Sequence, residues 1–123
     1  MAARILDIES LHQQLKTHPR SAEMGMIASH RGLVRGTSRT GALVSGLTIH
    51  FNQKVVESIV ESTRQRPGII KVVARYNEGS LKVGDDVLVV LVAGDIRENV
   101  FPALVDAVEQ IKRQGASKTE DII

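Results

Sequence analysis

The sequence predicts one α+β domain, residues 1–123, in which helices pack on a mixed or antiparallel sheet. Two observations lead to this fold class. Apolar residues switch along the chain between helical spacing and strand-like runs, which gives the order α, β, β, α, β, β, α. A length of 123 residues also suits a single domain and is enough to bury one core.

Three elements precede the middle of the chain. Residues 10–16 have the spacing of a short helix, and residues 25–34, with small apolar side chains, are typical of a strand. Residues 43–51 alternate, and one side of this second strand should hold Leu43, Ser45, Leu47, Ile49 and Phe51. We expect the two strands to form a hairpin around the loop between them.

A second helix is expected to begin after Asn52 and to end near Arg66. Asn52 is a favourable N-cap residue, and Pro67-Gly68 stops a helix. The apolar stripe of this helix consists of Val55, Val56, Ile59, Val60 and Thr63. The stripe predicts that the helix faces the core.

Two β-branched runs, residues 69–76 and 87–93, predict central strands. The second run is apolar enough to be buried on both faces. Between the runs, turn-forming residues flank a short segment around Leu81.

The last helix is expected within residues 95–113. Asp95 and Glu98 have the spacing of a capping box, but this would leave Pro102 in the second turn, so the regular helix is expected to start at Asn99. A helical wheel predicts a buried face of Phe101, Leu104, Val105, Val108 and Ile111.

Lys112 lies at nearly the same azimuth as Phe101, which is unusual for a lysine. Its stem could follow apolar surface and bring the ammonium to the rim of a pocket. Burial or nearby arginines would there lower its pKa and make it a useful acid or nucleophile. Alternatively, a lysine near a helix C-terminus complements the helix dipole and reaches water. The pattern leaves both interpretations open.

Residues 24–56 contain no Asp or Glu, and the charges in this run are positive. They come from Arg31, Arg35, Arg39 and Lys54, with His30 and His50 nearby. Arginine offers a planar set of donors to phosphate or carboxylate, and the glycines in the run let the backbone approach a ligand. The run therefore indicates an anion-binding site, with an ordinary exposed basic loop as the alternative.

Composition argues against several classes of function. Cysteine is absent, which excludes disulfides and thiolate metal sites, and the four histidines lack metal-ligand spacing, so neither a metal nor a cofactor is expected. Two Phe, one Tyr and no Trp offer little surface on which bases could stack, so nucleic acid is not an expected partner. There is no signal-like N-terminus and no membrane-length apolar run, which predicts a cytoplasmic protein without membrane association.

Four motifs together resemble the large, catalytic subunit of molybdopterin synthase over residues 25–120. Gly32-Leu-Val-Arg35 resembles the family's Gly-x-Val-Arg hairpin, and Leu81-Lys-Val-Gly-Asp85 resembles its Leu-x-x-Gly-Asp turn. Arg97 with Phe101 resembles the start of the family's last helix, and Lys112 falls on the lysine that follows that helix.

The resemblance implies the family's α/β hammerhead fold and a homodimer at the centre of a heterotetramer. Two small ubiquitin-like subunits would each insert a Gly-Gly C-terminus that carries a thiocarboxylate. The large subunit would transfer this sulfur twice to cyclic pyranopterin monophosphate, which gives the dithiolene of molybdopterin. The lack of cysteine agrees with this scheme because the partner supplies the sulfur.

The resemblance also implies site residues. Lys112 would orient the thiocarboxylate or protonate a leaving oxygen, and Lys118 would be the second catalytic lysine. Arg35 would hold phosphate or pterin and Arg97 would complete the anion site, while Arg39 is a candidate because of the charge of its loop. A straight helix would separate Arg97 from Lys112 by ~22 Å, so a shared site would need Arg97 from a neighbouring protomer.

The chain departs from the family's pattern in several places, which include a longer turn at residues 76–80. The family's His before the helix arginine is Ile96 here, its His-Arg pair reads Ala74-Arg75, and residues 115–120 lack its Pro and Trp. Three hypotheses therefore stay open: an active large subunit, a paralogue that keeps the fold without sulfur transfer, or an unrelated anion-binding module. No regular structure is predicted for residues 119–123.

Overall fold

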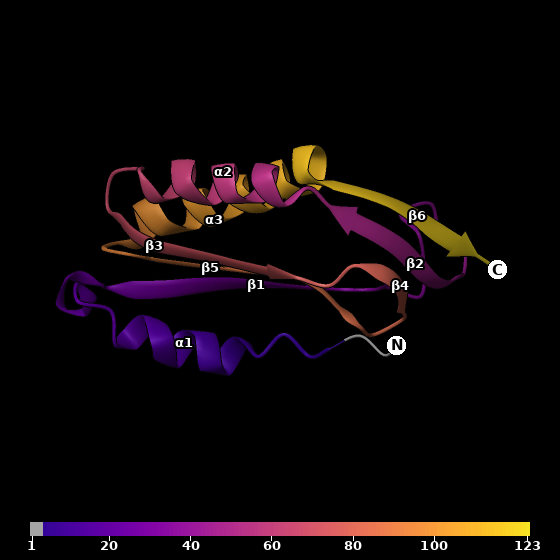
Figure 1. Ribbon diagram of the computed structural model, residues 1–123, viewed down its shortest axis with the longest axis horizontal. Helices are drawn as coiled ribbons and strands as arrows, with labels where there is room; N and C mark the ends of the chain where they lie inside the picture. The colour runs from indigo at the N-terminus through magenta and orange to yellow at the C-terminus, as the bar shows by residue number, and fades with distance from the viewer. Residues whose placement is uncertain (1–3) are drawn as a thin grey trace.

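The computed structural model describes residues 4–123 and contains two antiparallel sheets of three strands each within that range (Figure 1). The first sheet has the order β1 (Met26–Leu33), β5 (Asp86–Gly94), β3 (Ile69–Tyr76). The second has the order β4 (Gly79–Lys82), β2 (Val44–Phe51), β6 (Ala116–Ile122). The α+β class is confirmed, although β4 and β6 were missing from the predicted order, and residues 1–3 of the predicted domain lie outside the described residues.

Helices cover both faces of the first sheet (Figure 1). They are α1 (Ile8–Lys16), α2 (Gln53–Arg64) and α3 (Arg97–Gln110), with a short 3₁₀ turn η1 (Ser21–Glu23) and a π-helical turn η2 (Ile111–Gly115). Helix α1 lies on one face of the sheet, and α2 lies with α3 on the other. No helix within residues 4–123 is long and apolar enough to cross a membrane.

Strand β5 lies at the centre of the core and is buried on both faces, as predicted. Leu88, Val90 and Val92 point into the cluster formed with α2 and α3. The alternate residues Val89, Leu91 and Ala93 pack with Leu11 and Leu15 of α1. This strict alternation explains why the run is apolar at every position.

Strand β3 was predicted to be central, and this was wrong for the described part of the chain, where β5 is its one partner. Its composition resembles a central strand because helices cover both of its faces. Ile69 and Val72 join the cluster under α2 and α3, whereas Val73 packs toward α1. The amino-acid composition of a strand indicates whether its two faces are buried. It does not indicate whether both of its edges are hydrogen-bonded to other strands.

The predicted hairpin between residues 25–34 and 43–51 was also wrong. Strand β1 pairs with β5, and β2 pairs with β4 and β6 in the other sheet. Val34 explains the crossing: its N–H donates to the carbonyl of Asp85 and its carbonyl accepts from Gly84, which ties the start of the loop to the β4–β5 turn. Its buried side chain then packs with Leu47 and Leu81 in the core of the second sheet.

A β-bulge changes which residues of β2 point inward. The register shifts between Val44 and Gly46, so Ser45 is the extra residue. Leu43 and Ser45 are therefore exposed, contrary to the predicted alternation, and Val44 is buried instead. Leu47 and Ile49 are buried as predicted.

Helix α2 follows the prediction. The side chain of Asn52 accepts a hydrogen bond from the N–H of Val55 at 3.2 Å, which caps the first turn. The predicted stripe is buried at Val56, Ile59 and Thr63 and partly buried at its two other positions. Helix α1 begins two residues earlier than predicted, because Asp7 accepts from the N–H of Ser10 at 3.0 Å and serves as the N-cap.

The start of α3 differs from the prediction. The helix begins at Arg97, not at Asn99, and includes Pro102. Asp95 does not form a capping box with Glu98: its Oδ1 accepts from the N–H of Ile96 at 2.6 Å and from the side-chain amide of Asn99 at 2.9 Å.

The buried face of α3 is also different. The fully buried residues are Val100, Ala103, Ala107 and Ile111. Phe101 and Val105 were predicted to be buried, yet they are 52% and 54% exposed. The two alanines allow the helix to approach the sheet closely, so small residues face the core where the wheel had assigned large ones.

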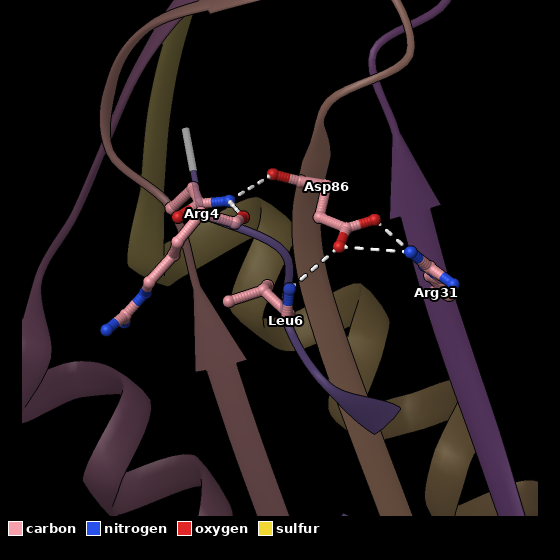
Figure 2. Close-up of polar contacts among 5 residues, drawn as sticks. Arg4, Leu6, Arg31 and Asp86 are labelled. Carbon is pink, nitrogen blue, oxygen red and sulfur yellow. Dashed lines mark hydrogen bonds and ion pairs between the residues drawn. The ribbon is translucent and has the colours of Figure 1, made fainter. Parts of the chain in front are cut away.

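The segment before α1 is held by hydrogen bonds to Asp86, the first residue of β5 (Figure 2). The buried carboxylate of Asp86 accepts hydrogen bonds from Nε and Nη2 of Arg31 at 2.8 and 3.1 Å, and from the N–H of Leu6 at 2.8 Å. Asn77 adds bonds from its side-chain amide to the carbonyls of Arg4 and Asp86. Arg31 is therefore engaged in a structural ion pair.

Candidate functional site

A cavity of about 140 Å³ lies where elements of both sheets meet the end of α3. Most of its wall is apolar and includes Leu47, Ile49, Phe51, Val87 and Leu88. Two lysines, Lys112 and Lys118, also line it. The cavity is thus an apolar pocket with amines at its wall.

The cavity opens into a wider groove of about 910 Å³, since Leu33, Leu47 and the two lysines line both. The groove adds Arg35, Arg39 and one carboxylate, Glu120. Four of the five predicted site residues therefore line one continuous space: Lys112, Lys118, Arg35 and Arg39. Four cations and one anion give this space a positive field.

Lys112 reaches the cavity through the π-helical turn η2. The α-helical wheel does not extend past Gln110, because η2 changes the number of residues per turn from Ile111 onward. Fully buried Ile111 holds the start of this turn in the core, and the carbonyl of Gly115 accepts from the N–H of Asn52 at 2.7 Å at its end. Lys112 therefore lines a pocket and is also exposed to solvent, so the structure is compatible with both interpretations of this lysine.

Lys118 comes from a strand that was not predicted. Residues 116–122 form β6, which pairs with β2 so that Lys118 lies opposite Ile49. Ala116, Lys118 and Glu120 alternate along one side of β6 and line the cavity or the groove. The strand escaped prediction because its sequence, Ala-Ser-Lys-Thr-Glu-Asp-Ile, has few apolar residues.

The electrostatics of the site act most strongly on Lys112. Partial burial removes water from the Lys112 ammonium, and this desolvation is the main cause that lowers its pKa. The positive charges of Lys118 and Arg39 lower the pKa further. The residue still has exposed surface, so the ammonium sits at the mouth and is only partly desolvated. A lysine in this environment gives up a proton more readily than one in water.

The loop between β1 and β2 presents Arg35 and Arg39 to the groove. Ser38 organises its tip: its N–H donates to the carbonyl of Ala42 at 2.9 Å, and its hydroxyl accepts from the N–H of Ala42 at 3.1 Å. Gly41 has φ +90°, a conformation that favours glycine, and completes the turn. The loop is basic, and it is also ordered by its own hydrogen bonds.

Arg97 does not reach this space within one protomer. It begins α3, whereas η2 and Lys112 follow the other end of that helix. Its side chain is 78% exposed and pairs with the neighbouring Glu98 at 3.2 Å.

Two residues in or beside the site were not predicted as site residues. Glu120 lines the groove, and only its position two residues after Lys118 in an alternating strand could have indicated it. His30 lies on β1 with its Nε2 buried, and Gly32 separates it from the cavity. Its place two residues before Gly32, on the same side of a strand, was the available signal. Among residues 4–123, no group of three or more His, Asp or Glu side chains is placed to hold a metal ion.

The sequence matches a known protein family. The model of the MoaE protein family matches residues 1–114. No curated protein matches the sequence.

Solved structures share the fold. Molybdopterin synthase from Staphylococcus aureus superposes with a TM-score of 0.79 at 18% identity, covering 99% of this chain and 89% of that one. Molybdopterin cofactor biosynthesis protein E from Burkholderia multivorans ATCC 17616 gives 0.76 at 23% identity, with 98% and 85% covered. A complex of subunits 1 and 2 of molybdopterin-converting factor from Helicobacter pylori 26695 gives 0.71 at 16% identity, with 94% and 79% covered.

The family match spans most of the chain, and these structures share its arrangement of two sheets and three helices. The chain therefore belongs to the MoaE family, the large-subunit family of molybdopterin synthase.

Proposed function

We propose that this chain transfers sulfur from a thiocarboxylated, small ubiquitin-like subunit to cyclic pyranopterin monophosphate and so forms the dithiolene of molybdopterin. The observation that carries the proposal is the apolar cavity that has two lysines in its wall and opens into a basic groove. Family membership supports the same reaction.

The cavity and the groove suit different parts of the reactants. A narrow apolar cavity suits an extended glycine tail, whose thiocarboxylate would lie near Lys112 and Lys118. Arg35 and Arg39 in the groove suit the phosphate of the pterin substrate. The thiocarboxylate sulfur forms a carbon–sulfur bond to the pterin as an oxygen leaves the same pterin carbon. Water then cleaves the bond between this sulfur and the acyl carbon, so the small subunit leaves as a carboxylate. The lowered pKa of Lys112 suits it to give a proton to the leaving oxygen. The scheme needs neither a metal nor a cofactor.

The proposed assembly is a homodimer within a heterotetramer. The Helicobacter pylori relative is a complex of two subunits, which supports a small partner here. Ile96, Phe101 and Val105 are half exposed on or next to α3, which supports self-association through that helix. A homodimer would also allow Arg97 of one protomer to complete the site of its partner. We include in the proposal the cytoplasmic location expected from the sequence.

A reconstituted sulfur-transfer assay tests the function. The chain is mixed with a thiocarboxylated small subunit from the same genome and with cyclic pyranopterin monophosphate, and the dithiolene product is measured. Product that depends on Lys112, and so disappears with Lys112→Ala, supports the proposal. Lys54→Ala is the matched control, because Lys54 is exposed on α2 away from the site.

A paralogue without sulfur transfer is the second candidate. The observation that favours it is Ile96, which stands where the family has a histidine next to the helix arginine. Binding of the small subunit with no product from the unaltered chain would support this candidate and overturn the first.

A further inference from the structure

His30 is a partly buried titratable group that the proposed reaction does not use. It lies on β1 opposite Val90 of β5, and its side chain is partly buried. Its Nε2 is shielded from solvent and has no hydrogen-bond partner among the described residues. An unpaired buried nitrogen costs free energy unless another state of the molecule supplies a partner.

The position of Gly32 connects His30 to the cavity. Gly32 lines the cavity together with Lys112, and a Cβ built on it would lie 3.0 Å from Nε2 of His30. Only a residue without a side chain therefore separates the imidazole from the space that Lys112 faces. A larger residue at position 32 would crowd the imidazole.

Lys112 is the charged group whose influence reaches the imidazole. Burial is the main cause that lowers the pKa of His30, and the positive charge of Lys112 is the second. From β5, the opposing side chains Val90 and Leu88 are apolar. The pKa of Lys112 is itself influenced by Lys118 on β6 and Arg39 in the loop, so the cations beyond it come from two more elements.

We propose that His30 is a positioning residue for Lys112: its Nε2 accepts a hydrogen bond from the Lys112 ammonium and holds that ammonium against the wall of the cavity. A neutral imidazole with its proton on Nδ1 offers Nε2 as an acceptor, and an ammonium has three donors. The flexible four-carbon stem of lysine lets Nζ turn toward Nε2 while η2 stays in place. No covalent bond forms or breaks, and the pair carries one positive charge, on Nζ.

The hydrogen bond explains how a partly buried lysine with positive neighbours can stay protonated. Burial, Lys118 and Arg39 all disfavour the charged form of Lys112. A hydrogen bond that only the charged form donates opposes these effects and keeps the proton available. His30 would thereby set both the place and the acidity of the proton donor. The catalytic consequence rests on the proposed function, but the hydrogen bond itself does not.

The test is an NMR titration in the absence of substrate. Lysines are labelled by reductive methylation with ¹³C-formaldehyde, and the signal of Lys112 is assigned by its loss in Lys112→Met. His30→Phe fills the same space without an acceptor, and it should lower the titration midpoint of Lys112 by on the order of one pH unit. His30→Gln keeps an acceptor and should restore most of the midpoint. His50→Phe is the control, because His50 is an exposed histidine on β2.

A reciprocal titration keeps the proposal testable if His30→Phe fails to fold. In Lys112→Met, the imidazole signals of His30 should titrate at higher pH than in the unaltered chain, because both the hydrogen bond and the positive charge are gone. The proposal is overturned if the Lys112 midpoint is equal in the unaltered chain and in His30→Phe. Unchanged titration of His30 in Lys112→Met would overturn it too. Neither readout depends on turnover, so a failure of the sulfur-transfer assay remains distinguishable from a failure of this inference.

Discussion

Lys112 and Lys118 line one cavity from two different elements, the π-helical turn after α3 and strand β6. Their charges oppose each other, and Lys118 is one of the causes that lower the pKa of Lys112. The second sheet therefore forms part of the cavity wall and also contributes Lys118, whose positive charge lowers the pKa of Lys112.

Replacing Lys118 by Met should raise the pKa of Lys112, because one neighbouring positive charge is removed while the desolvation of the Lys112 ammonium is unchanged. The measurement is the pH dependence of Lys112 acylation by an acetylating reagent, followed by peptide mass spectrometry. At a fixed pH near 9, acylation of Lys112 should become slower in Lys118→Met, by about threefold for half a pKa unit. Lys54→Met is the control, and equal rates in Lys118→Met and the unaltered chain would contradict the prediction.

Arg35→Ala should weaken binding of the phosphate-bearing substrate. Loss of a charge-assisted hydrogen bond at an exposed groove should raise KM about tenfold and change kcat less. Steady-state kinetics with varied cyclic pyranopterin monophosphate measures this. Arg64→Ala is the comparison, since Arg64 pairs with Glu61 on α2 and lies outside the groove. A fall in kcat with unchanged KM would count against a role in substrate binding.

Arg97 and Lys112 should complement each other across a homodimer. If Arg97→Ala and Lys112→Ala each abolish turnover, unfolding and refolding them together should restore about one quarter of the original activity, because half of random dimers are mixed and each has one intact site. Refolding each variant alone is the control. Inactive mixtures that still contain mixed dimers would show that both residues act within one protomer.

Glutamate at both Phe101 and Val105 should weaken self-association. The two side chains are about half exposed, so the fold should tolerate the change, whereas burial of two carboxylates between protomers is costly. Light scattering after size-exclusion chromatography should show a shift from dimer to monomer, with an unchanged circular dichroism spectrum. Glu109→Ala changes another exposed position of α3 and serves as the control. A dimer that persists in the double variant would move the interface elsewhere.

Asp86→Asn should destabilise the fold by about 1–3 kcal/mol, the cost of leaving buried hydrogen-bonding groups poorly paired. The carboxylate accepts from both Arg31 and the N–H of Leu6, so the segment before α1 should loosen first. Urea unfolding measures the free energy, and hydrogen exchange at Leu6 measures the local opening. Asp106→Asn is the comparison, because that carboxylate is half exposed in its pair with Arg66.

The same carboxylate predicts a dependence on acid. The hydrogen bond from Arg31 is the main cause that holds the pKa of Asp86 below its ordinary value, and the Leu6 N–H adds to it. Its stabilisation is therefore complete above the unfolded-state pKa of about 3.9 and is lost as pH falls toward the lower folded-state pKa. Below about pH 4, the difference in unfolding free energy between Asp86→Asn and the unaltered chain should shrink. A constant difference down to pH 2 would contradict this assignment.

The sequence predicted a helix or strand correctly where a local pattern of residues is sufficient to specify it. Asn52 and the stripe that follows it specify α2, and the apolar run of β5 specifies a strand buried on both faces. Pairing could not be predicted, because whether β1 joins β2 or β5 depends on where Val34 packs after the chain has turned. The face of α3 was misassigned because Ala103 and Ala107 are buried for their small size, which a hydrophobicity pattern does not weigh.

The candidate site was predictable in its charges but not in its assembly. The acid-free run pointed to Arg35 and Arg39, which line the groove. Lys112 lines the same space through the π-helical turn η2, which the wheel that singled it out did not include. The polar sequence of β6 concealed a strand, since its stability comes from pairing with β2 and not from an apolar face of its own. His30 was not predicted as a site residue for a different reason: its spacing from Gly32 indicates a shared side of the strand, but not that this side faces a cavity.

The pairing of β6 with β2 also has a consequence for biogenesis. Val44 is matched with Ile122, so this ladder joins elements from distant parts of the chain, and β6 follows every other described element in order of synthesis. Contacts of such long range form slowly, and here they cannot begin until β6 has left the ribosome. The first sheet and its helices can fold before then. The cavity therefore gains the part of its wall that Ala116 and Lys118 supply only after β6 has paired with β2.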